Sequence, residues 1–378
     1  MTHANTSNHE NDKKNRKIKV CYVLSYKSPN YIRTKALINA LNDAEEVELH
    51  EARNSRKGLA RYLQTTIRLL KVRCHCNPDI YIVGFRGHEI YWLVRLIAGK
   101  KPIIFDEMMS PSLSLIEEEE KPLNNISGKL LRIAEKAILK NADYIITDTN
   151  LHVEHIHKNY DKINKEKILA IPVGAVEGGN IEGLRRDTSN NIKNNYLTVL
   201  YYGSFLPLHG IDVIIRSAHI NKNLPINYIF IGGNKESAKL LSEHFPKHST
   251  SIYNHKIWVP YNTLIEEVIP KADLLLGGPF GGTPQALRVV TGKTSQALAH
   301  GKPTIIGEID EDYGFISKEN CILVKQQSPE SLANAIKWAY ENLEKLDEIG
   351  KKGYVNYMKN LSTKIIKERI VSIIRSIE

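Results

Sequence analysis

The chain has 378 residues, of which 42% are hydrophobic and 25% charged, and its formal net charge at pH 7 is +10. This composition is that of a globular protein, and nothing in it indicates a fibrous or wholly disordered chain. The length is too great for one ordinary core and fits two domains of ~100–200 residues each. The positive charge indicates an anionic partner, which is a nucleic acid, an anionic membrane surface or a phosphorylated small molecule.

Residues 1–16 are polar and contain no apolar segment of the signal-peptide type, so we expect a flexible tail and a cytoplasmic protein. No apolar run reaches the ~18–20 residues of a membrane-spanning helix, and the nearest, Ile90–Ala98, contains Arg95. Four scattered cysteines fit a reducing compartment. The run Cys74-His75-Cys76 has no second ligand cluster, and we predict no metal site.

From residue 17 short β-branched or aromatic runs alternate with helix-length segments, which predicts a parallel sheet with helices on both faces. The expected strands are Lys19–Leu24, Val47–His50, Ile80–Phe85, Pro102–Asp106 and Tyr144–Thr147. The expected helices are Tyr31–Asn42, Leu59–Val72, His88–Ala98 and Ile126–Lys140. We place a first Rossmann-like domain at residues 17–175.

The stretch Gly174–Asn195 is rich in Gly, Asn, Arg and Asp, and we interpret it as the connection between two domains. The alternation then begins again, which predicts a second Rossmann-like domain at residues 196–358. Its expected strands are Thr198–Tyr202, Tyr228–Ile231, Leu274–Leu276, Thr304–Ile306 and Ile322–Val324. Its expected helices are Ile211–His219, Leu264–Ile269, Thr294–His300 and Ser331–Leu343.

The tail Leu346–Glu378 has isoleucines at helical spacing on one face and Lys and Arg on the other. We expect residues of about 360–378 to pack across the first domain, and binding to a membrane surface is the alternative.

The segment from Gly277 to Gly307 carries the clearest chemical signal. It predicts a strand end, a glycine-rich loop, a helix over Gly292–His300 with Thr291 as its N-cap, and a further strand. The N-terminus of that helix offers free N–H groups and a positive dipole end beside Arg288 and Lys293. We therefore predict a diphosphate site that needs no metal.

A second segment, Leu200–Gly210, predicts a strand that ends in Gly203-Ser204 and a loop that enters a helix. Ligands bind at the carboxyl ends of strands in an open parallel sheet, and a glycine there lets the backbone approach an anion closely. A Gly-Ser turn after a strand is common, so this signal depends on the neighbouring Arg288 and Lys293.

Four motifs follow one another in the second half of the chain. They are Gly203-Ser204-x(4)-His209-Gly210, Trp258-Val-Pro-Tyr261, Ala272-Asp273 and Thr283-Pro-x(3)-Arg288-x(4)-Lys293-x(2)-Gln296-Ala-Leu-x(2)-Gly301-Lys-Pro303. In this order and spacing, over about residues 201–324, the sequence resembles the donor half of family 4 glycosyltransferases. The resemblance implies a GT-B architecture, in which two Rossmann-like domains face each other across a cleft.

The resemblance further implies a retaining transfer of a sugar from a nucleotide diphosphate without a bound metal or other cofactor. It assigns Gly203 and Ser204 to backbone contacts with the diphosphate and Arg288 and Lys293 to a cationic clamp. The donor site that we predict comprises Gly203, Ser204, His209, Phe280, Arg288, Lys293, Thr294 and Gln296.

The sequence departs from the family at two places. Many members carry two glutamates in an E-x(7)-E pattern, and Arg288 and Gln296 stand at those positions here. His209 stands where a lysine is usual, and a neutral imidazole is a weaker cation. These departures motivate an alternative reading, a noncatalytic subunit that binds a nucleotide sugar. A sugar-nucleotide epimerase, which shares the paired-domain architecture, is a further alternative.

Polar residues at two strand ends of the first domain are candidates for the acceptor side. Arg86, His88, Asp106 and Glu107 are candidates to orient the acceptor hydroxyl or take its proton, and His88 and Asp106 are the predicted catalytic residues. Arg86 and Arg33 are predicted to contact the acceptor or an anion. The structural alternative is that His88 begins a helix and Asp106 caps a turn. The run Glu117–Glu120 is interpreted as a solvated surface.

The sequence thus predicts a glycosyltransferase that uses a UDP- or GDP-linked donor. The expected acceptor is a sugar, a lipid-linked saccharide or a polysaccharide, and the positive charge suggests peripheral contact at the inner membrane face. A nucleic-acid partner is disfavoured, because no motif interleaves aromatic and basic residues for stacking on bases.

Overall fold

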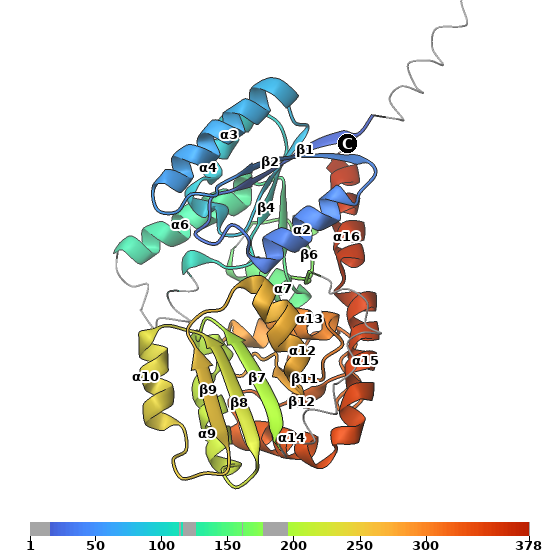
Figure 1. The fold of residues 1–378 in the computed structure, drawn as a ribbon. Coiled ribbons are helices and arrows are strands. Elements are labelled where there is room, and N and C mark those ends of the chain that lie inside the picture. Colours follow the sequence, from blue (N-terminus) through green and yellow to red (C-terminus); the bar gives the residue numbers. More distant parts are fainter. Residues whose placement is uncertain (1–15, 113–114, 116–125, 161, 177–195, 378) are drawn as a thin grey trace, which may run out of the picture.

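The computed structural model describes residues 16–112, 115, 126–160, 162–176 and 196–377, which form two α/β units stacked one above the other (Figure 1). Three sequence predictions lie wholly or mostly outside these residues: the polar tail 1–16, the run Glu117–Glu120 and the connection Gly174–Asn195.

The first unit contains a six-stranded parallel sheet with the strand order β2-β1-β3-β4-β5-β6. The strands are β1 (Ile18–Leu24), β2 (Val47–Arg53), β3 (Ile80–Val83), β4 (Ile103–Asp106), β5 (Tyr144–Thr147) and β6 (Ile168–Ala170). The sequence pattern predicts the first five. It gives no signal for β6, because three residues are too few to show an alternation.

Helices cover both faces of this sheet, because its strands are apolar on both sides. The helices are α2 (Ile32–Asn42), α3 (Ala60–Cys76), α4 (Tyr91–Ala98), α6 (Ile126–Asn141) and α7 (Asn150–Asn159), with short 3₁₀ turns η1 (Gly87–Glu89) and η2 (Lys165–Lys167). Cys21 and Val23 of β1 pack with residues of α3, α4 and α6, whereas Val20 and Tyr22 face the α2 side. The pattern does not predict α7.

The second unit repeats the plan with the strand order β12-β11-β10-β7-β8-β9, again all parallel. The strands are β7 (Leu197–Gly203), β8 (Ile226–Gly232), β9 (Ile252–Lys256), β10 (Leu274–Leu276), β11 (Thr304–Gly307) and β12 (Ile322–Val324). The predicted α/β class with two doubly wound sheets is confirmed. The pattern misses β9, an edge strand without buried residues.

The helical elements of the second unit are η4 (Pro207–His209), α9 (Ile211–Ile220), α10 (Lys235–His244), α11 (Tyr261–Thr263), η5 (Leu264–Val268), α12 (Ile269–Lys271), η6 (Ala286–Arg288), α13 (Gly292–Ala299), α14 (Pro329–Glu341) and α15 (Leu343–Asn360). A last helix, α16 (Thr363–Ile377), follows α15 after a break, so the tail is two helices rather than the single one expected. Figure 1 shows α15 along the second unit and α16 along the first.

The apolar face of α16 is buried against α2: Ile366, Ile370 and Ile374 share a core cluster with Leu37 and Leu41. This face is therefore not available to a membrane. Among the described residues, no helix combines the length and the apolar character that a transmembrane span requires.

Candidate functional site

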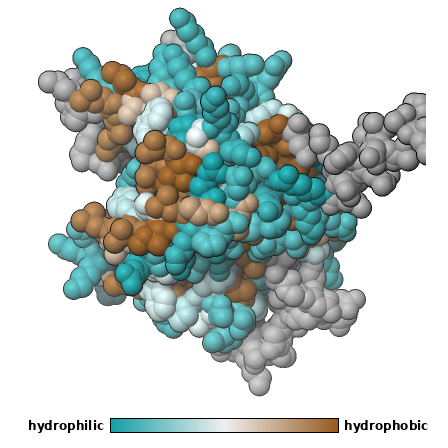
Figure 2. All heavy atoms as spheres, turned by 90° about the horizontal axis from the view of Figure 1, so that it is seen from above, coloured by the Kyte–Doolittle hydropathy of each residue, from teal (hydrophilic) through white to brown (hydrophobic). Residues whose placement is uncertain are grey.

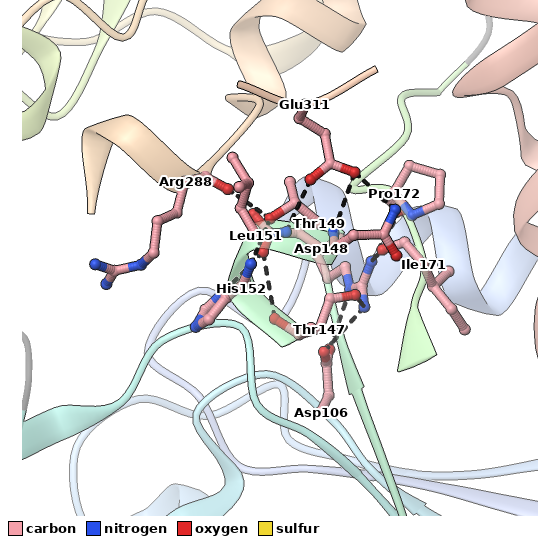
Figure 3. A network of polar contacts seen from close by, with 12 residues as sticks. Asp106, Thr147, Asp148, Thr149, Leu151, His152, Ile171, Pro172, Arg288 and Glu311 are labelled. Atoms are coloured by element: carbon pink, nitrogen blue, oxygen red, sulfur yellow. Dashed lines mark hydrogen bonds and ion pairs between the residues drawn. The ribbon is translucent and has the colours of Figure 1, made fainter. Parts of the chain in front are cut away.

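The carboxyl ends of strands from both sheets meet at the boundary between the two units. Thr149 follows β5, and its hydroxyl donates to the backbone carbonyl of Arg288, which follows β10. Glu311 follows β11 and accepts hydrogen bonds from the backbone N–H groups of Asn150 (3.2 Å) and Leu151 (2.8 Å) at the start of α7 (Figure 3). Open parallel sheets bind ligands at these ends, so the predicted donor and acceptor residues belong to edges that face each other.

Gly203 ends β7 with φ +139°, a backbone angle that side chains rarely tolerate. A Cβ at this position would lie 3.3 Å from Lys293 Nζ. The exposed Ser204 follows directly. The structure therefore brings two of the predicted donor residues, Gly203 and Lys293, together.

Two loops of the second unit pack against each other beside this point. The Gly281 N–H donates to the Leu208 carbonyl at 3.0 Å, and a Cβ on Gly210 would lie 2.7 Å from Gly281 N. Phe280 is 1% exposed and belongs to the core under the loop. The geometry therefore gives Phe280 a role in supporting the loop, and its predicted contact with the donor stays a prediction.

Helix α13 begins as the sequence predicts. Thr291 is its N-cap and accepts a hydrogen bond from Thr294 N at 3.2 Å. Thr294 is fully buried, and its hydroxyl donates to the Gly278 carbonyl at 3.2 Å. The first N–H groups of a helix have no partner within it, so this terminus favours an anion.

Lys293, in the first turn of α13, is the residue with the most distinctive electrostatics. It is only 8% exposed, and among the described residues no carboxylate lies within ion-pair distance of its ammonium group. Its nearest aromatic contact is the Tyr201 ring, with Nζ 5.5 Å from the centroid. Burial lowers the pKa of Lys293 to about 7. A buried cation without a counter-charge is costly, and an anionic ligand would stabilise it.

His209 lies beside the same lysine. Burial, together with the charge of Lys293, lowers the pKa of His209 well below its usual value. The ring is therefore neutral at pH 7, and its Nδ1 has no hydrogen-bond partner among the described residues. A neutral imidazole can donate or accept one hydrogen bond but adds no positive charge.

Arg288 and Gln296, at the positions of the family's acidic pair, point to different neighbours. The Arg288 guanidinium donates from Nη1 to the Pro284 carbonyl at 2.8 Å and lies close enough to α7 to affect His155. Burial and this guanidinium lower the pKa of His155 to about 4. Gln296 is buried, donates to the Val176 carbonyl at 3.0 Å and accepts from the Tyr261 hydroxyl at 3.1 Å. The two cations of a clamp approach the same anion rather than each other, so the clamp of Arg288 and Lys293 stays a prediction.

In the first unit, Arg33 and Asp106 form a fully buried ion pair, 3.1 Å from Nη2 to Oδ1 and 3.3 Å from Nε to Oδ2. Arg33 also donates to the carbonyls of Thr147 (3.3 Å), Ile171 and Pro172 (2.8 Å). Burial raises the pKa of Asp106, and the guanidinium opposes that shift. Neither side chain reaches solvent, so the geometry assigns both a structural role and does not support the acceptor contact predicted for Arg33 or the proton transfer predicted for Asp106.

His88 lies in η1, after β3, and its Nε2 is 2.7 Å from the buried carboxylate of Glu107, the residue that follows β4. Burial alone would lower the pKa of His88, but the Glu107 carboxylate outweighs it, and the pKa is raised above its usual value. The structure thus pairs the predicted His88 with Glu107, a further candidate from the sequence. A carboxylate that holds an imidazole is a familiar arrangement for a general base.

Arg86 has left-handed backbone geometry with φ +56°, immediately before η1. Its guanidinium lies 3.5 Å from the Met109 sulfur, beside a cluster in which the Tyr31 and Phe85 rings stack at 4.6 Å. Arg86 is half-exposed and therefore open to a ligand. Its predicted contact with the acceptor stays a prediction.

Two polar networks are absent from the sequence predictions. The first is the contact of Glu311 with the start of α7, which joins residues 160 positions apart. The second surrounds the buried Glu135, which accepts from Ser112 N at 2.7 Å and from the Tyr160 hydroxyl at 2.9 Å. Neither has a local sequence signal, because each partner comes from a distant part of the chain.

No three His, Cys, Asp or Glu side chains come together as a metal site anywhere in the described part of the chain. A pocket of about 560 Å³ lies between α7, β6 and α16, and it contains none of the predicted site residues.

Comparison of the whole chain with known proteins gives the fold. Neither a protein-family model nor a curated protein matches the sequence. Solved structures do match: HepE from Anabaena in complex with UDP-glucose has a TM-score of 0.67 at 13% identity, over 95% of this chain and 100% of that one. Sucrose-phosphate synthase from Thermosynechococcus elongatus has a TM-score of 0.68 at 14% identity, over 95% and 99%. The chain has the GT-B fold.

A glycosyltransferase from Rickettsia africae agrees, with a TM-score of 0.61 at 13% identity over 96% of this chain and 98% of that one. Identities this low establish the architecture and leave the activity to be argued from the site.

Proposed function

We propose that the protein is a glycosyltransferase whose second unit holds a nucleotide-diphosphate sugar and whose first unit holds the acceptor. The observation that carries the proposal is Lys293, a buried cation without a carboxylate partner in the described chain, at the N-terminus of α13 and beside Gly203. The likeness to HepE, crystallised with UDP-glucose, supports a donor of this class.

The proposed roles of the donor-site residues follow from the charges that develop during sugar transfer. When the bond to the sugar breaks, negative charge develops on the departing nucleoside diphosphate, and the sugar carbon becomes positive. Lys293 and the N–H groups of α13 would stabilise that negative charge without a bound metal, while Gly203 and Ser204 let the backbone approach it. We propose transfer with retention of the anomeric configuration, in line with the resemblance to family 4.

His88, oriented by Glu107, is our candidate to receive the proton of the acceptor hydroxyl. Arg86 is the candidate contact for the acceptor, which we propose to be a sugar, lipid-linked or polysaccharide hydroxyl in glycan synthesis at the inner membrane face. We propose no part in the reaction for Arg33 and Asp106, because both side chains are buried and pair with each other.

A noncatalytic subunit that binds a nucleotide sugar is the second candidate. It is favoured by Arg288 and Gln296, which replace the family's acidic pair, and by the contacts of Gln296 with Val176 and Tyr261, which occupy its amide. A sugar-nucleotide epimerase would interconvert donors without any acceptor.

The experiment is calorimetric titration of UDP and GDP into the wild type, Lys293→Ala and Arg288→Ala. We expect selective binding of one base and its loss in Lys293→Ala, with binding retained in Lys337→Ala, an exposed lysine on α14. Release of sugar from the bound nucleotide sugar then separates a transferase from a mere binder. If the wild type bound neither UDP nor GDP, the proposal would be wrong.

A further inference from the structure

One surface of the first unit carries an unusual number of exposed apolar side chains. They project from α3, α4 and α6 and from the residue that precedes α3: Leu59, Leu63, Ile67, Leu70, Trp92, Leu96, Leu130 and Ile133. Leu59 is 85% exposed and Leu96 79%. Figure 2 shows hydrophobic side chains gathered on the left of its view, the side on which these three helices lie in Figure 1.

The three helices are neighbours on one face of the sheet. Residues of all of them share a single core cluster, and Arg95 of α4 donates to the Asn141 side chain at the end of α6 at 2.9 Å. On α3 the exposed residues recur every three or four positions, so they form one stripe along the outer side of the helix. We call this set of helices and its exposed side chains the α3–α4–α6 surface.

The charge of the same helices is strongly one-sided. They contain four Lys or Arg residues on α3, one on α4 and four on α6, and their only acidic residue is Glu135. Glu135 is 1% exposed and hydrogen-bonded within the protein, so no carboxylate of these helices faces solvent. The exposed cations include Arg68, Lys71, Lys129 and Arg132.

We propose that the α3–α4–α6 surface docks the protein on an anionic lipid bilayer. Leu, Ile and Trp side chains enter the boundary between headgroups and acyl chains, while the surrounding Lys and Arg contact lipid phosphates. The complementary charge favours an anionic surface over a neutral one. The apolar side chains project outward from the helices, so they are able to enter the headgroup region of a bilayer.

The placement of this surface links it to the acceptor. Arg61 at the start of α3 pairs with Glu89 at 2.8 Å, directly after His88. A bilayer on this surface would thus lie next to the edge of the first unit where we place the acceptor. In that respect the inference rests on the proposed function and selects a lipid-linked acceptor among the candidates.

The test is flotation of the full chain with vesicles of phosphatidylglycerol and phosphatidylcholine, and with phosphatidylcholine alone. We expect binding to the anionic vesicles only, weakened by added salt. The variants Leu63→Ser/Leu96→Ser/Ile133→Ser and Lys71→Glu/Lys129→Glu/Arg132→Glu should each lower the bound fraction at least about tenfold. The matched control, Ile220→Ser/Ile316→Ser/Val355→Ser, changes three apolar side chains of the second unit that are also more than half exposed, and it should bind as the wild type does.

Titration of UDP-glucose into every variant keeps this test separate from that of the donor site, because the donor residues are unchanged. Wild-type protein that binds nucleotide but never floats with anionic vesicles would overturn the docking proposal alone. Equal loss in the control variant would overturn it too. So would a shift from dimer to monomer in the surface variants, since the surface would then be an interface between two copies.

Discussion

The first and second units differ in whether their buried ionisable side chains have partners of opposite charge. In the first unit, the buried Asp106 and Glu107 each face a cationic or titratable partner, Arg33 and His88. In the second unit, Lys293 is buried without a carboxylate among the described residues. Paired charges satisfy each other and hold the fold, whereas an unpaired one leaves an interaction for a ligand to complete.

This contrast distinguishes the predicted site residues that pair within the protein from the one that has no carboxylate partner among the described residues. Arg33 and Asp106 have the residue types of a binding site, but their hydrogen bonds all go to the protein. Lys293 is a buried basic residue like Arg33, yet no carboxylate among the described residues pairs with it. Residue type predicts which groups are able to bind an anion, and only the partners show which of them is available to do so.

The largest effect is expected at the buried pair. Asp106→Ala leaves the Arg33 guanidinium without its partner and should lower the free energy of unfolding by about 3–5 kcal/mol, measured by urea denaturation. The double variant Arg33→Met/Asp106→Leu removes both charges and should recover most of that loss. A stable Asp106→Ala protein that binds donor but transfers no sugar would restore Asp106 as a catalytic residue.

A change of the free energy of unfolding in the opposite direction is expected at Lys293. Lys293→Met removes a desolvated charge and should raise the free energy of unfolding of the ligand-free protein by ~1–3 kcal/mol while it abolishes nucleotide binding. Because the pKa of this lysine is about 7 when folded and near 10.5 when unfolded, the unfolded chain binds more protons between these values. The free energy of unfolding of the wild type should therefore rise between pH 7 and pH 10 through the deprotonation of Lys293. In Lys293→Met this contribution should be absent.

A smaller effect is expected where the two units touch. Glu311→Gln removes the charge that caps α7 across the boundary and should lower the free energy of unfolding by about 1 kcal/mol, measured by thermal denaturation. Asp310→Asn, on the exposed neighbouring residue, is the matched control and should have no effect. If Glu311→Gln and Asp310→Asn changed the free energy of unfolding equally, the contact of Glu311 with the start of α7 would not stabilise the protein.

The smallest effect is expected at His88, and it depends on pH. Because Glu107 raises the folded pKa of His88 above that of the unfolded chain, the stabilisation is complete at low pH and is lost as pH rises through the folded value. Glu107→Gln should lower the pKa of His88 in an NMR titration and flatten the stability profile above pH ~6.5. An unchanged His88 pKa would show that the pair is not formed.

Local signals in the sequence were sufficient for most of the framework. The Thr291 cap and the strand that ends at Gly203 depend on residues a few positions apart, so pattern and propensity predict them. The short β6 and the exposed edge strand β9 carry too little alternation, and the break between α15 and α16 at Leu361 and Ser362 has neither Gly nor Pro to mark it.

The site was less predictable, because its decisive features are contacts between distant residues. The pairing of Arg33 with Asp106 joins positions 73 residues apart, and the contact of Gln296 with Val176 spans 120. Without these partners the sequence assigns Arg33, Asp106 and Gln296 to ligands. The structure places Gly203 beside Lys293, and the contacts of the predicted donor residues with a diphosphate stay predictions.

The most direct test of the account is the pH dependence of UDP-glucose binding from pH 6 to 9, in the wild type and in Lys293→Arg. A bound diphosphate requires the protonated lysine, whose pKa in the free protein is about 7, so binding takes up a proton and the wild-type affinity should fall by up to about tenfold per unit above pH 7. The guanidinium of Lys293→Arg stays charged, and its affinity should be nearly constant over this range. The same pH profile in both proteins would contradict the claim that an unpaired Lys293 holds the donor.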